Sequence, residues 1–496
     1  MVKEYREIIK KYFKDISLVE SNLISFNNFM EKGIQKCIEE IEEIVPTIIP
    51  KEAENFRVKF GKVTITKPEI VEADGSKRRI FPMEARLRQL TYSASINVEV
   101  NAYVNDIQRE SFITEIGKIP VMIKSRFCHL QGLKEDDLIK NGEDPSDPGG
   151  YFILNGNERV LINVEDLVSN KMFIEENPEG ASSKFTAKLF SERGSYRIPH
   201  LIEYMKDGIL YLSFTRFKRV PIIGIIKALG LVKDQDIMSN ISKEKQYDAV
   251  YINLVESVDL KTEEDALESL AKRMGVVQPR EVRIEKAKEQ LDKYLLPHLG
   301  ITPETRLLKA YNLCKLIKRF LVVVEEGINV EDKDHLMNKR LKLSGDLLMD
   351  LFRVNLRNLI QDILYNFQRL VKRGKFQSIK IIIRNELLSN RIKSAMATGI
   401  WVGGRKGISQ NMDRTNFISM LSHLQRVVSL LDSTQENFEA RALHCTHLGR
   451  YCPVETPEGT PIGLRKNLAL MASITQDEVS DEKLRKSLEE IGLKLI

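Results

Sequence analysis

Three prolines and three glycines are interleaved within the segment 449–463, and their spacing restricts the backbone more than any other feature of the chain. The prolines stand at 453, 457 and 461, and the glycines at 449, 459 and 463. Each proline removes a backbone donor and fixes φ, while each glycine admits conformations that other residues avoid. Neither a helix nor a strand can run through such a segment. We therefore expect an ordered, irregular loop, and loops of this length are usually functional.

The loop and its flanks carry a mixed set of polar side chains, which are His447, Arg450, Glu455, Glu458, Arg465 and Lys466. Held on a rigid backbone, such a set can contact phosphate, sugar hydroxyl or base edges. Two other chemistries are open. His444, Cys445, His447 and Cys452 offer the usual ligands of zinc, although no Cys-x₂-Cys pair is present and the cysteines can equally be packed thiols.

A metal-dependent nuclease is the second of these alternatives. It would need Asp413, Glu455 and Glu458 to act together as a carboxylate set. Carboxylates that stand between basic residues more often fix arginine side chains by charge-assisted hydrogen bonds. The sequence leaves both interpretations open.

Length and composition predict a multidomain protein. The 496 residues exceed the roughly 100–200 of a typical domain, so two to four packed units are expected. No apolar run approaches the roughly 18 residues of a membrane span, and the first residues lack the apolar core of a signal peptide. We expect a cytoplasmic protein with no membrane partner. Five cysteines at irregular spacing argue against a disulfide framework.

The positive charge is concentrated in one segment. Between residues 339 and 426 there are 17 Lys and Arg against 5 Asp and Glu, a balance of +12, whereas the whole chain carries +6 and the remainder therefore −6. A basic stripe on an otherwise balanced chain is expected of a surface that follows phosphates. A solvated helix face is the alternative.

Local patterns predict a mixture of helices and strands. Apolar residues at three- and four-residue steps predict a helix from Ile24 that stops at Pro46. Asp74-Gly75 and Asn155-Gly156 each stand between strand-like runs, and 96–104 alternates cleanly between apolar and polar residues. The first 165 residues or so therefore have an α+β pattern.

The rest of the chain divides near residue 340. The pattern of 166–340 mixes strands with helices such as 263–274, which Thr262 opens and Gly275 closes, and we expect this stretch to form a second domain. A long helical period follows over 344–373. After Arg391 the chain becomes glycine-rich and polar.

Five ordered motifs link the chain to a known family. GRYCPVETPEGTPIGLRKNLAL at 449–470 and GISQNMDRTNFISMLSHLQR at 407–426 resemble two segments of the second-largest (B or β-like) subunit of multisubunit DNA-dependent RNA polymerase. FPMEARLRQLTYSASINVEV, IPVMIKSRFCHL and DPGGYFILNGNERVLI are the three earlier matches, in the family's order. The resemblance covers at least residues 59–473. It is strongest to the N-terminal half of the split B subunit of some archaea, whose natural end the helical stretch 481–496 also resembles.

The resemblance implies an α+β multidomain architecture. A mixed helix and sheet protrusion is expected from 1–166 and 341–405. A lobe domain is expected as an insertion at 167–340. An irregular fork region is expected at 406–496.

The reaction that the resemblance implies is nucleotidyl transfer by the assembled polymerase. Its Mg²⁺ ions would be held mainly by the largest subunit, so no catalytic residue, metal site or bound cofactor is expected in this chain, and the isolated chain should be inactive. The expected partners are the C-terminal half of the B subunit, the largest subunit, the remaining subunits, the DNA template and the RNA transcript.

The resemblance also implies two groups of site residues. The expected nucleic-acid contacts are Arg405, Lys406, Gln410, Asp413, Arg426, His447, Arg450 and Glu458, with Arg426 on a helix over 418–431. The expected mobile fork loop near the point of strand separation consists of Asp432, Ser433, Thr434, Gln435, Glu436, Asn437 and Phe438.

A solvated role for Arg426 is the alternative at the level of the residue. At the level of the whole chain the alternative is a DNA-binding or structural module outside any polymerase. A polymerase part should assemble onto chains that carry the rest of the B subunit and the largest subunit, whereas a free-standing module should function alone.

Overall fold

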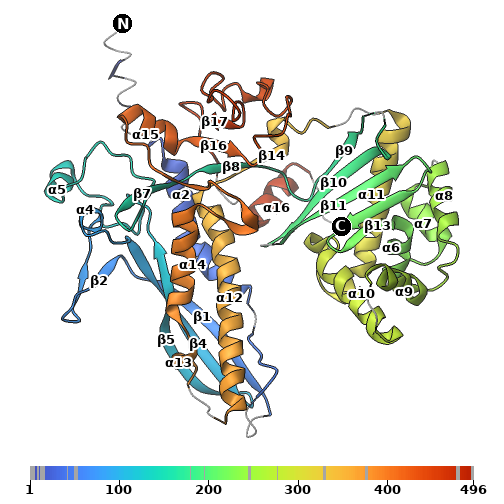
Figure 1. Ribbon diagram of the computed structural model, residues 1–496, viewed down its shortest axis with the longest axis horizontal. Coiled ribbons are helices and arrows are strands. Elements are labelled where there is room, and N and C mark those ends of the chain that lie inside the picture. The colour runs from blue at the N-terminus through green and yellow to red at the C-terminus, as the bar shows by residue number, and fades with distance from the viewer. Residues whose placement is uncertain are drawn as a thin grey trace. The chain divides into compact units, whose positions relative to one another are not determined.

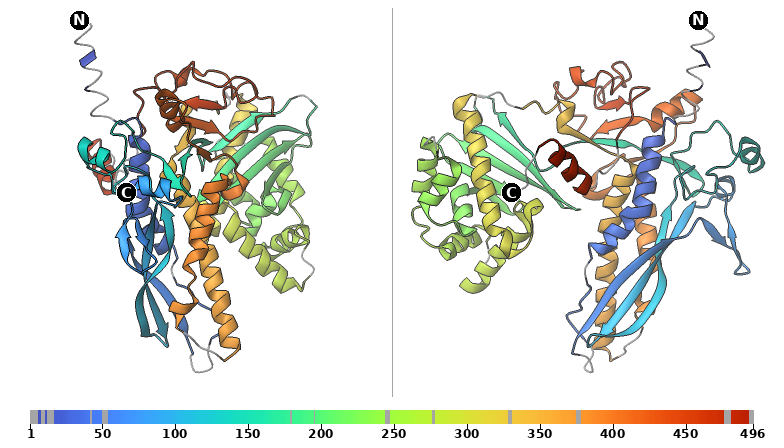
Figure 2. Two further views of the ribbon diagram at one scale, coloured as in Figure 1. Left: turned by 60° about the vertical axis from the view of Figure 1, so that its left-hand side comes forward. Right: turned by 180° about the vertical axis from the view of Figure 1, so that it is seen from behind.

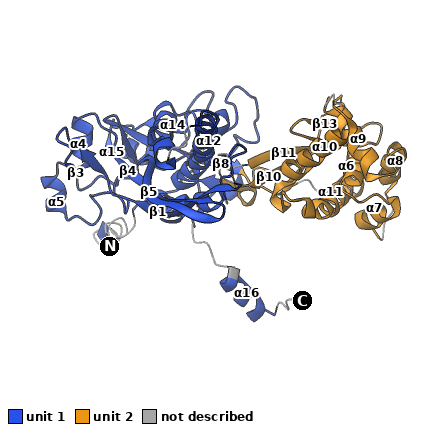
Figure 3. Ribbon diagram, turned by 90° about the horizontal axis from the view of Figure 1, so that it is seen from below, with its two compact units in different colours: residues 1–166, 341–496 blue, residues 167–340 orange. Residues whose placement is uncertain are grey.

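The computed structural model describes residues 6–7, 11, 17–41, 43–49, 54–178, 180–194, 196–243, 247–275, 278–327, 331–374, 378–475 and 481–492. The chain divides into two compact units, which Figure 3 colours separately. Unit 1 consists of Met1–Asp166 and Leu341–Ile496, and unit 2 consists of Leu167–Arg340. Both mix helices with sheets, as expected. Among the described residues no helix is long and apolar enough to cross a membrane.

Unit 1 begins with a broken helix. Its parts are α2 (Glu20–Asn28), the π-helical turn η1 (Phe29–Gly33) and α3 (Ile34–Glu39). The single helix expected up to Pro46 is therefore wrong in its end and in its regularity. A Cβ at Gly33 would lie 3.1 Å from the Phe29 ring, so the glycine allows the wider turn to pack closely.

The longest strands of unit 1 form a three-stranded sheet of order β1-β4-β5, with β1 (Phe56–Ile65), β4 (Ser93–Val104) and β5 (Ile107–Pro120). The alternation expected over 96–104 is confirmed, since Ile96, Val98 and Val100 are fully buried. The helices α12 (Ser344–Lys372) and α14 (Asn385–Thr398), orange in Figures 1 and 2, lie along this sheet and bury their apolar faces. The short helix α13 (Ile379–Ile382) lies between them in the chain.

Both expected hairpins are present. Asp74-Gly75 joins β2 (Glu69–Val71) to β3 (Lys77–Arg79), and Asn155-Gly156 joins β6 (Phe152–Leu154) to β7 (Asn157–Leu161). Asn155 and Gly156 have φ of +49° and +79°, which a two-residue hairpin turn requires. Strand β15 (Ser409–Asn411) adds to β7, which gives the order β15-β7-β6. Helix α4 (Pro82–Leu87) contacts β6, and α5 (Glu135–Lys140) precedes β6 in the chain.

A four-stranded sheet joins segments that are far apart in the sequence. Its order is β14-β8-β16-β17, with β14 (Lys339–Lys342), β8 (Asn163–Leu167), β16 (Arg426–Ser429) and β17 (Arg465–Asn467). β16 pairs in parallel with β8 and antiparallel with β17. Helix α15 (Phe417–Leu424) immediately precedes β16, and α16 (Asp481–Glu490) follows the sheet in the chain.

Unit 2 has its own core around an antiparallel sheet of order β13-β12-β11-β10-β9. The strands are β9 (Met172–Glu176), β10 (Ser183–Arg193), β11 (Tyr196–Met205), β12 (Leu210–Phe214) and β13 (Phe217–Pro221). The helices are α6 (Ile222–Ala228), α7 (Asp234–Ile241), α8 (Asp248–Glu256), α9 (Glu263–Arg273), α10 (Arg280–Tyr294) and α11 (Arg306–Glu326). The expected cap of α9 is confirmed, because the Thr262 hydroxyl accepts the Asp265 N–H at 3.2 Å.

Candidate nucleic-acid interface

The basic segment ends on a strand. The helix expected over 418–431 is present only as far as Leu424, where α15 ends, and the placement of Arg426 on it is wrong, because Arg426 is the first residue of β16. Val427 and Val428 follow it, and β-branched residues favour a strand that is paired on both sides. The Cα partners are Arg426 with Asn467 and Val428 with Arg465. Since side chains alternate along a strand, Arg426, Arg465 and Asn467 share one face of the sheet.

The opposite face of the sheet is held by a buried polar network. Lys466 Nζ lies 3.0 and 3.2 Å from the two carboxylate oxygens of Glu165, and the Tyr451 hydroxyl donates to Glu165 at 2.9 Å. Burial, and then the charge of Glu165, raise the pKa of the Tyr451 phenol, which therefore stays protonated and able to donate. The network therefore links β8, β17 and Tyr451, the residue that directly follows Arg450.

Arg426 is a half-buried cation without an ion pair among the residues that the structure describes. Burial lowers the pKa of its guanidinium, and the charge of Arg465 lowers it further, while Glu455 and Asp413 act in the opposite direction. Arg465 is exposed. Two neighbouring cations that share a face and lack a paired carboxylate suit an anionic ligand such as phosphate.

A buried histidine organises the groups beside Arg426. His423 Nδ1 accepts the backbone N–H of Asp413 at 3.1 Å, so the ring proton belongs on Nε2, which lies 3.2 Å from Gln410 Oε1. Burial, and then the charge of Arg426, lower the pKa of His423 to about 4. The ring is therefore neutral near pH 7. The N–H of Thr415 donates to the Asp413 carboxylate at 2.9 Å and lowers its pKa.

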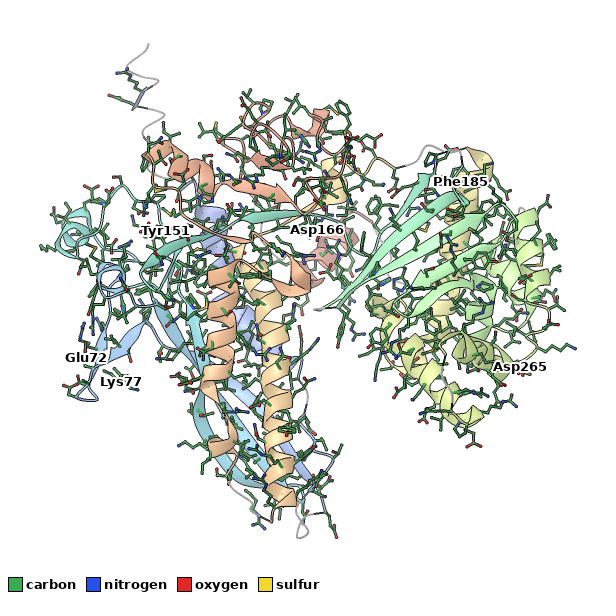
Figure 4. The ribbon with its side chains drawn as sticks, viewed as in Figure 1. Glu72, Lys77, Tyr151, Asp166, Phe185 and Asp265 are labelled. Carbon is green, nitrogen blue, oxygen red and sulfur yellow. The ribbon has the colours of Figure 1, made fainter. Side chains whose placement is uncertain are left out.

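A second arginine of the same segment lies in a very different environment around Tyr151, which Figure 4 labels. The guanidinium of Arg414 lies 2.7 Å from Glu158 and 3.0 Å from Asp147, and its centre lies 5.2 Å from the centre of the Tyr151 ring. Arg86 donates to the Tyr151 hydroxyl and to Glu158, each at 2.8 Å. This cluster holds β6, β7 and the chain after β15 together.

The amino-acid sequence of the chain matches the profiles of known protein families. Residues 17–390 match the sequence profile of a family described as RNA polymerase beta subunit. Residues 410–474 match a profile described as RNA polymerase Rpb2, domain 3. The first match alone covers more than half of the chain. The chain belongs to the RNA polymerase beta-subunit family.

Archaeal members of this family match the chain over nearly its whole length. DNA-directed RNA polymerase subunit Rpo2N of Methanocaldococcus jannaschii is 41% identical over 99% of this chain and 99% of its own length, and Rpo2N of Halobacterium salinarum is 39% identical over 99% and 96%. DNA-directed RNA polymerase subunit Rpo2 of Saccharolobus solfataricus is 42% identical over 99% of this chain. The chain spans only 43% of the length of that Rpo2.

Three of the residues expected to contact nucleic acid, Gln410, Asp413 and Arg426, lie in one cluster around His423. His423 was missed at the level of sequence, where its place in the motif at 407–426 was the available signal. Arg465 was noted in the loop but was not placed beside Arg426, because that neighbourhood depends on the register of β16 and β17.

The remaining expected contacts lie elsewhere. His447 is only 4% exposed and packs edge to face against Tyr451, with ring centres 5.4 Å apart. Arg450 is exposed, and its guanidinium donates to the Thr446 carbonyl at 3.2 Å. Glu458 is exposed and has no hydrogen bond or ion pair with a described residue. Their contact with nucleic acid stays a prediction.

Arg405 and Lys406 follow the short turn η5 (Val402–Gly404). Arg405 Nη2 lies 3.4 Å from Asp166, which Figure 4 labels, and Lys406 is exposed. Several cations of the basic segment are similarly paired with carboxylates, namely Lys339, Lys342, Arg353, Arg384, Arg405 and Arg414. The charge of +12 is thus partly neutralised by carboxylates of the same chain. The cations that lack such a partner are therefore better candidates for phosphate contact than the net charge suggests.

The expected fork loop, 432–438, is folded back on itself. The Asp432 carboxylate accepts the Thr434 N–H at 3.0 Å and the Thr434 hydroxyl at 2.9 Å. Phe438 is 83% exposed. That the loop is mobile and lies where strands separate stays a prediction.

The two metal-based alternatives gain no support. Within the described ranges no group of three or more His, Cys, Asp and Glu side chains could hold a metal ion. Glu455 accepts a hydrogen bond from the Ser422 hydroxyl of α15. Cys445 is exposed and Cys452 half-buried, and all five cysteines are free.

Proposed function

We propose that this chain is the N-terminal part of the second-largest subunit of a DNA-dependent RNA polymerase, and that it acts in templated RNA synthesis as one part of the assembled enzyme. The observation that carries the proposal is the match to the Rpo2N relatives over nearly the full length of both chains. In this proposal residues 1–166 and 341–405 are the protrusion, 167–340 the lobe and 406–496 the fork region.

The proposed nucleic-acid surface is the face of the four-stranded sheet that carries Arg426 and Arg465. Both cations would contact phosphates of the RNA–DNA hybrid, because neither is paired with a carboxylate of the described chain. Phosphate contacts carry no sequence information, as a polymerase that copies every template requires. Gln410 and Asp413, which His423 positions, would shape the same wall.

The other expected residues have supporting places in this proposal. Arg405, Lys406, Arg450 and Glu458 would border the hybrid, with Arg450 as a further phosphate contact. His447 would hold the backbone on which Arg450 stands through its contact with Tyr451. The fork loop 432–438 would stand near the point of strand separation.

The chemistry of this proposal requires Mg²⁺. In the assembled enzyme a bound Mg²⁺ would supply the activation of the RNA 3′ hydroxyl and the stabilisation of the leaving pyrophosphate. The described residues of this chain offer no group that fits a metal ion. From the resemblance to the polymerase family we assign the metal to partner chains, mainly the largest subunit, and assign to this chain the positioning of template and transcript.

Reconstitution tests the proposal. The chain is mixed with the C-terminal half of the B subunit, the largest subunit and the remaining subunits, and nucleotide incorporation is measured on a primed template with Mg²⁺. We expect incorporation only when this chain and its partners are all present. Robust templated synthesis by the pure chain, or undiminished synthesis by the mixture that lacks it, would contradict the proposal.

A further inference from the structure

Arg441 joins two loops that are separate in the sequence. We infer that Arg441 is a positioning residue that couples the loop 432–438 to the turn 459–463, which leads into β17. The coupling itself is a property of the described chain. Its consequence for nucleic acid rests on the proposed function.

The guanidinium of Arg441 donates to carbonyls of both loops. Nη1 lies 2.5 Å from the Thr460 oxygen and 3.1 Å from the Ile462 oxygen. Nη2 lies 2.9 Å from the Ser433 oxygen and 3.1 Å from the Gln435 oxygen. Each nitrogen therefore serves a different loop. A planar guanidinium with five N–H donors can make such a bridge, whereas a lysine ammonium has three donors at one point.

The main chain of Arg441 is also fitted to the turn. Gly463 has φ of +71°, and a Cβ there would lie 2.2 Å from the Arg441 carbonyl oxygen and 2.6 Å from its Cα. A side chain at position 463 would therefore clash with backbone atoms and strain its own backbone. The turn and residue 441 are held together both through the side chain and through this close approach.

The turn in turn fixes the residues proposed to meet the hybrid. The Gly463 N–H donates to the Thr456 hydroxyl at 2.9 Å, and that hydroxyl donates to the Arg465 carbonyl at 3.0 Å. The Ser429 N–H donates to the Leu464 carbonyl at 2.8 Å, which ties the same point to β16. Arg465 shares its sheet face with Arg426. A displacement of 432–438 would therefore be transmitted through Arg441 to Arg465.

In the assembled polymerase this coupling would link strand separation to the hold on the hybrid. Arg441 itself need not touch nucleic acid, because all four described bonds of its guanidinium go to carbonyls of this chain. Loss of Arg441 should then weaken the hold on the hybrid through Arg465.

Hydrogen exchange of the full chain tests the coupling directly. The variants are Arg441→Gln and Arg441→Lys, with Arg79→Gln as the control, because Arg79 is exposed on β3 and its side chain has no bond to a described residue. For Arg441→Gln we expect amide exchange to rise about tenfold in both 432–438 and 456–464, which corresponds to about 1.4 kcal/mol of opening free energy. Exchange in α12 should not change, and Arg441→Lys should be intermediate.

Gly463→Ala approaches the same contact from the other loop and should raise exchange in both segments as well. A rise confined to 432–438 in Arg441→Gln, or to 456–464 in Gly463→Ala, would overturn the coupling, as would no change in either variant. Thermal unfolding of α12 and of unit 2 is followed in parallel, to distinguish a local effect from global unfolding. Global unfolding of the variants would also overturn the coupling.

The consequence for nucleic acid is read in the assembled enzyme stalled on an RNA–DNA scaffold. We expect Arg441→Gln to shorten the lifetime of the complex, and Arg441→Lys to restore part of it. Coupled exchange in the chain with no change in lifetime would overturn the link to the hybrid and leave the coupling intact. Failure of the unmodified chain to assemble would instead refute the proposed function.

Discussion

Arg414 and Arg426 lie twelve residues apart in one basic segment, yet they stand in opposite electrostatic environments. Arg414 pairs with Glu158 and Asp147, which come from a part of the chain more than 250 residues away. The largest charge effect on Arg426 is that of Arg465, and Arg426 has no ion pair within the described chain. One cation is used to join segments of unit 1, and the other keeps its charge available.

This difference shows why a count of charges is a poor guide to a binding surface. Positive residues contribute to phosphate binding only where the fold leaves them unpaired. We call the group of Arg86, Asp147, Tyr151, Glu158 and Arg414 the Tyr151 cluster. Loss of an arginine should therefore have opposite effects in the Tyr151 cluster and on the sheet face that carries Arg426. The first should cost stability, and the second should cost affinity for nucleic acid.

The largest effect on stability is expected from Arg86→Ala. This change leaves the carboxylate of Glu143, which is 7% exposed, without its partner Arg86, while Glu158, which is 17% exposed, keeps Arg414. Breaking a buried pair in this way costs about 3–5 kcal/mol. Urea unfolding of the chain measures it, with Arg79→Ala, which should change stability by less than about 0.5 kcal/mol, as the control. Equal losses in both variants would show that the Tyr151 cluster does not hold unit 1.

His423 should make the stability of the cluster that it forms with Gln410, Asp413 and Arg426 sensitive to acid. Its pKa falls from 6.5 to about 4 in the folded chain, so the unfolded chain binds the proton first as pH falls. The stability that His423 contributes is therefore complete above pH 6.5 and is lost between pH 6.5 and 4, up to about 3 kcal/mol.

Unfolding at pH 7 and pH 4.5 tests this expectation in the parent chain and in His423→Asn, whose amide oxygen can still accept the Asp413 N–H. The variant should lose less stability on acidification. His200, whose pKa also falls to about 4, is present in both proteins and cancels in the comparison. An identical loss in both chains would mean that His423 is protonated, or free of the network, in the folded state.

Arg414→Gln and Arg426→Gln sharpen the comparison at smaller magnitude. Arg414→Gln removes charge-assisted bonds to two carboxylates and should cost about 1–3 kcal/mol. Arg426→Gln removes a half-buried cation beside another cation and should change stability by less than about 0.5 kcal/mol. Both are measured by urea unfolding under the same conditions. A larger loss for Arg426→Gln than for Arg414→Gln would reverse the assignment of roles.

Deletion of 432–438 should have the smallest effect on folding. The remaining bonds of Arg441 to Thr460 and Ile462 still hold the turn, so we expect assembly with partner chains to be intact and behaviour on downstream duplex DNA to be altered. Co-purification with the partner chains measures assembly. Failure to assemble would show that the loop is part of the core.

Local rules predicted the elements whose cause is local. The turns at Asp74-Gly75 and Asn155-Gly156, the alternation of β4 and the cap at Thr262 all follow from neighbouring residues, and the structure confirms them. The mixed architecture also followed from such patterns. The break at η1 did not, because it depends on how Phe29 packs around Gly33.

The candidate site was less accessible to sequence reasoning because its causes are long-range. Arg426 lies on a strand since β16 pairs with β8, more than 250 residues earlier in the chain. The role of His423 depends on a backbone N–H ten residues away, and the neutralisation of Arg414 depends on Glu158. Residue type and spacing suggested which segment to examine, whereas register decided which of its side chains meet.

The most direct test of the central claim uses the assembled enzyme stalled on a scaffold, with dissociation followed over a range of salt concentrations. Arg426→Ala and Arg450→Ala are compared separately with the parent. If each arginine contacts a hybrid phosphate, each variant should lower the salt slope of complex stability by about one unit and weaken binding uniformly across sequences. If both variants keep the parental slope and lifetime, the arginines are structural or solvated, and the proposed hybrid wall is wrong.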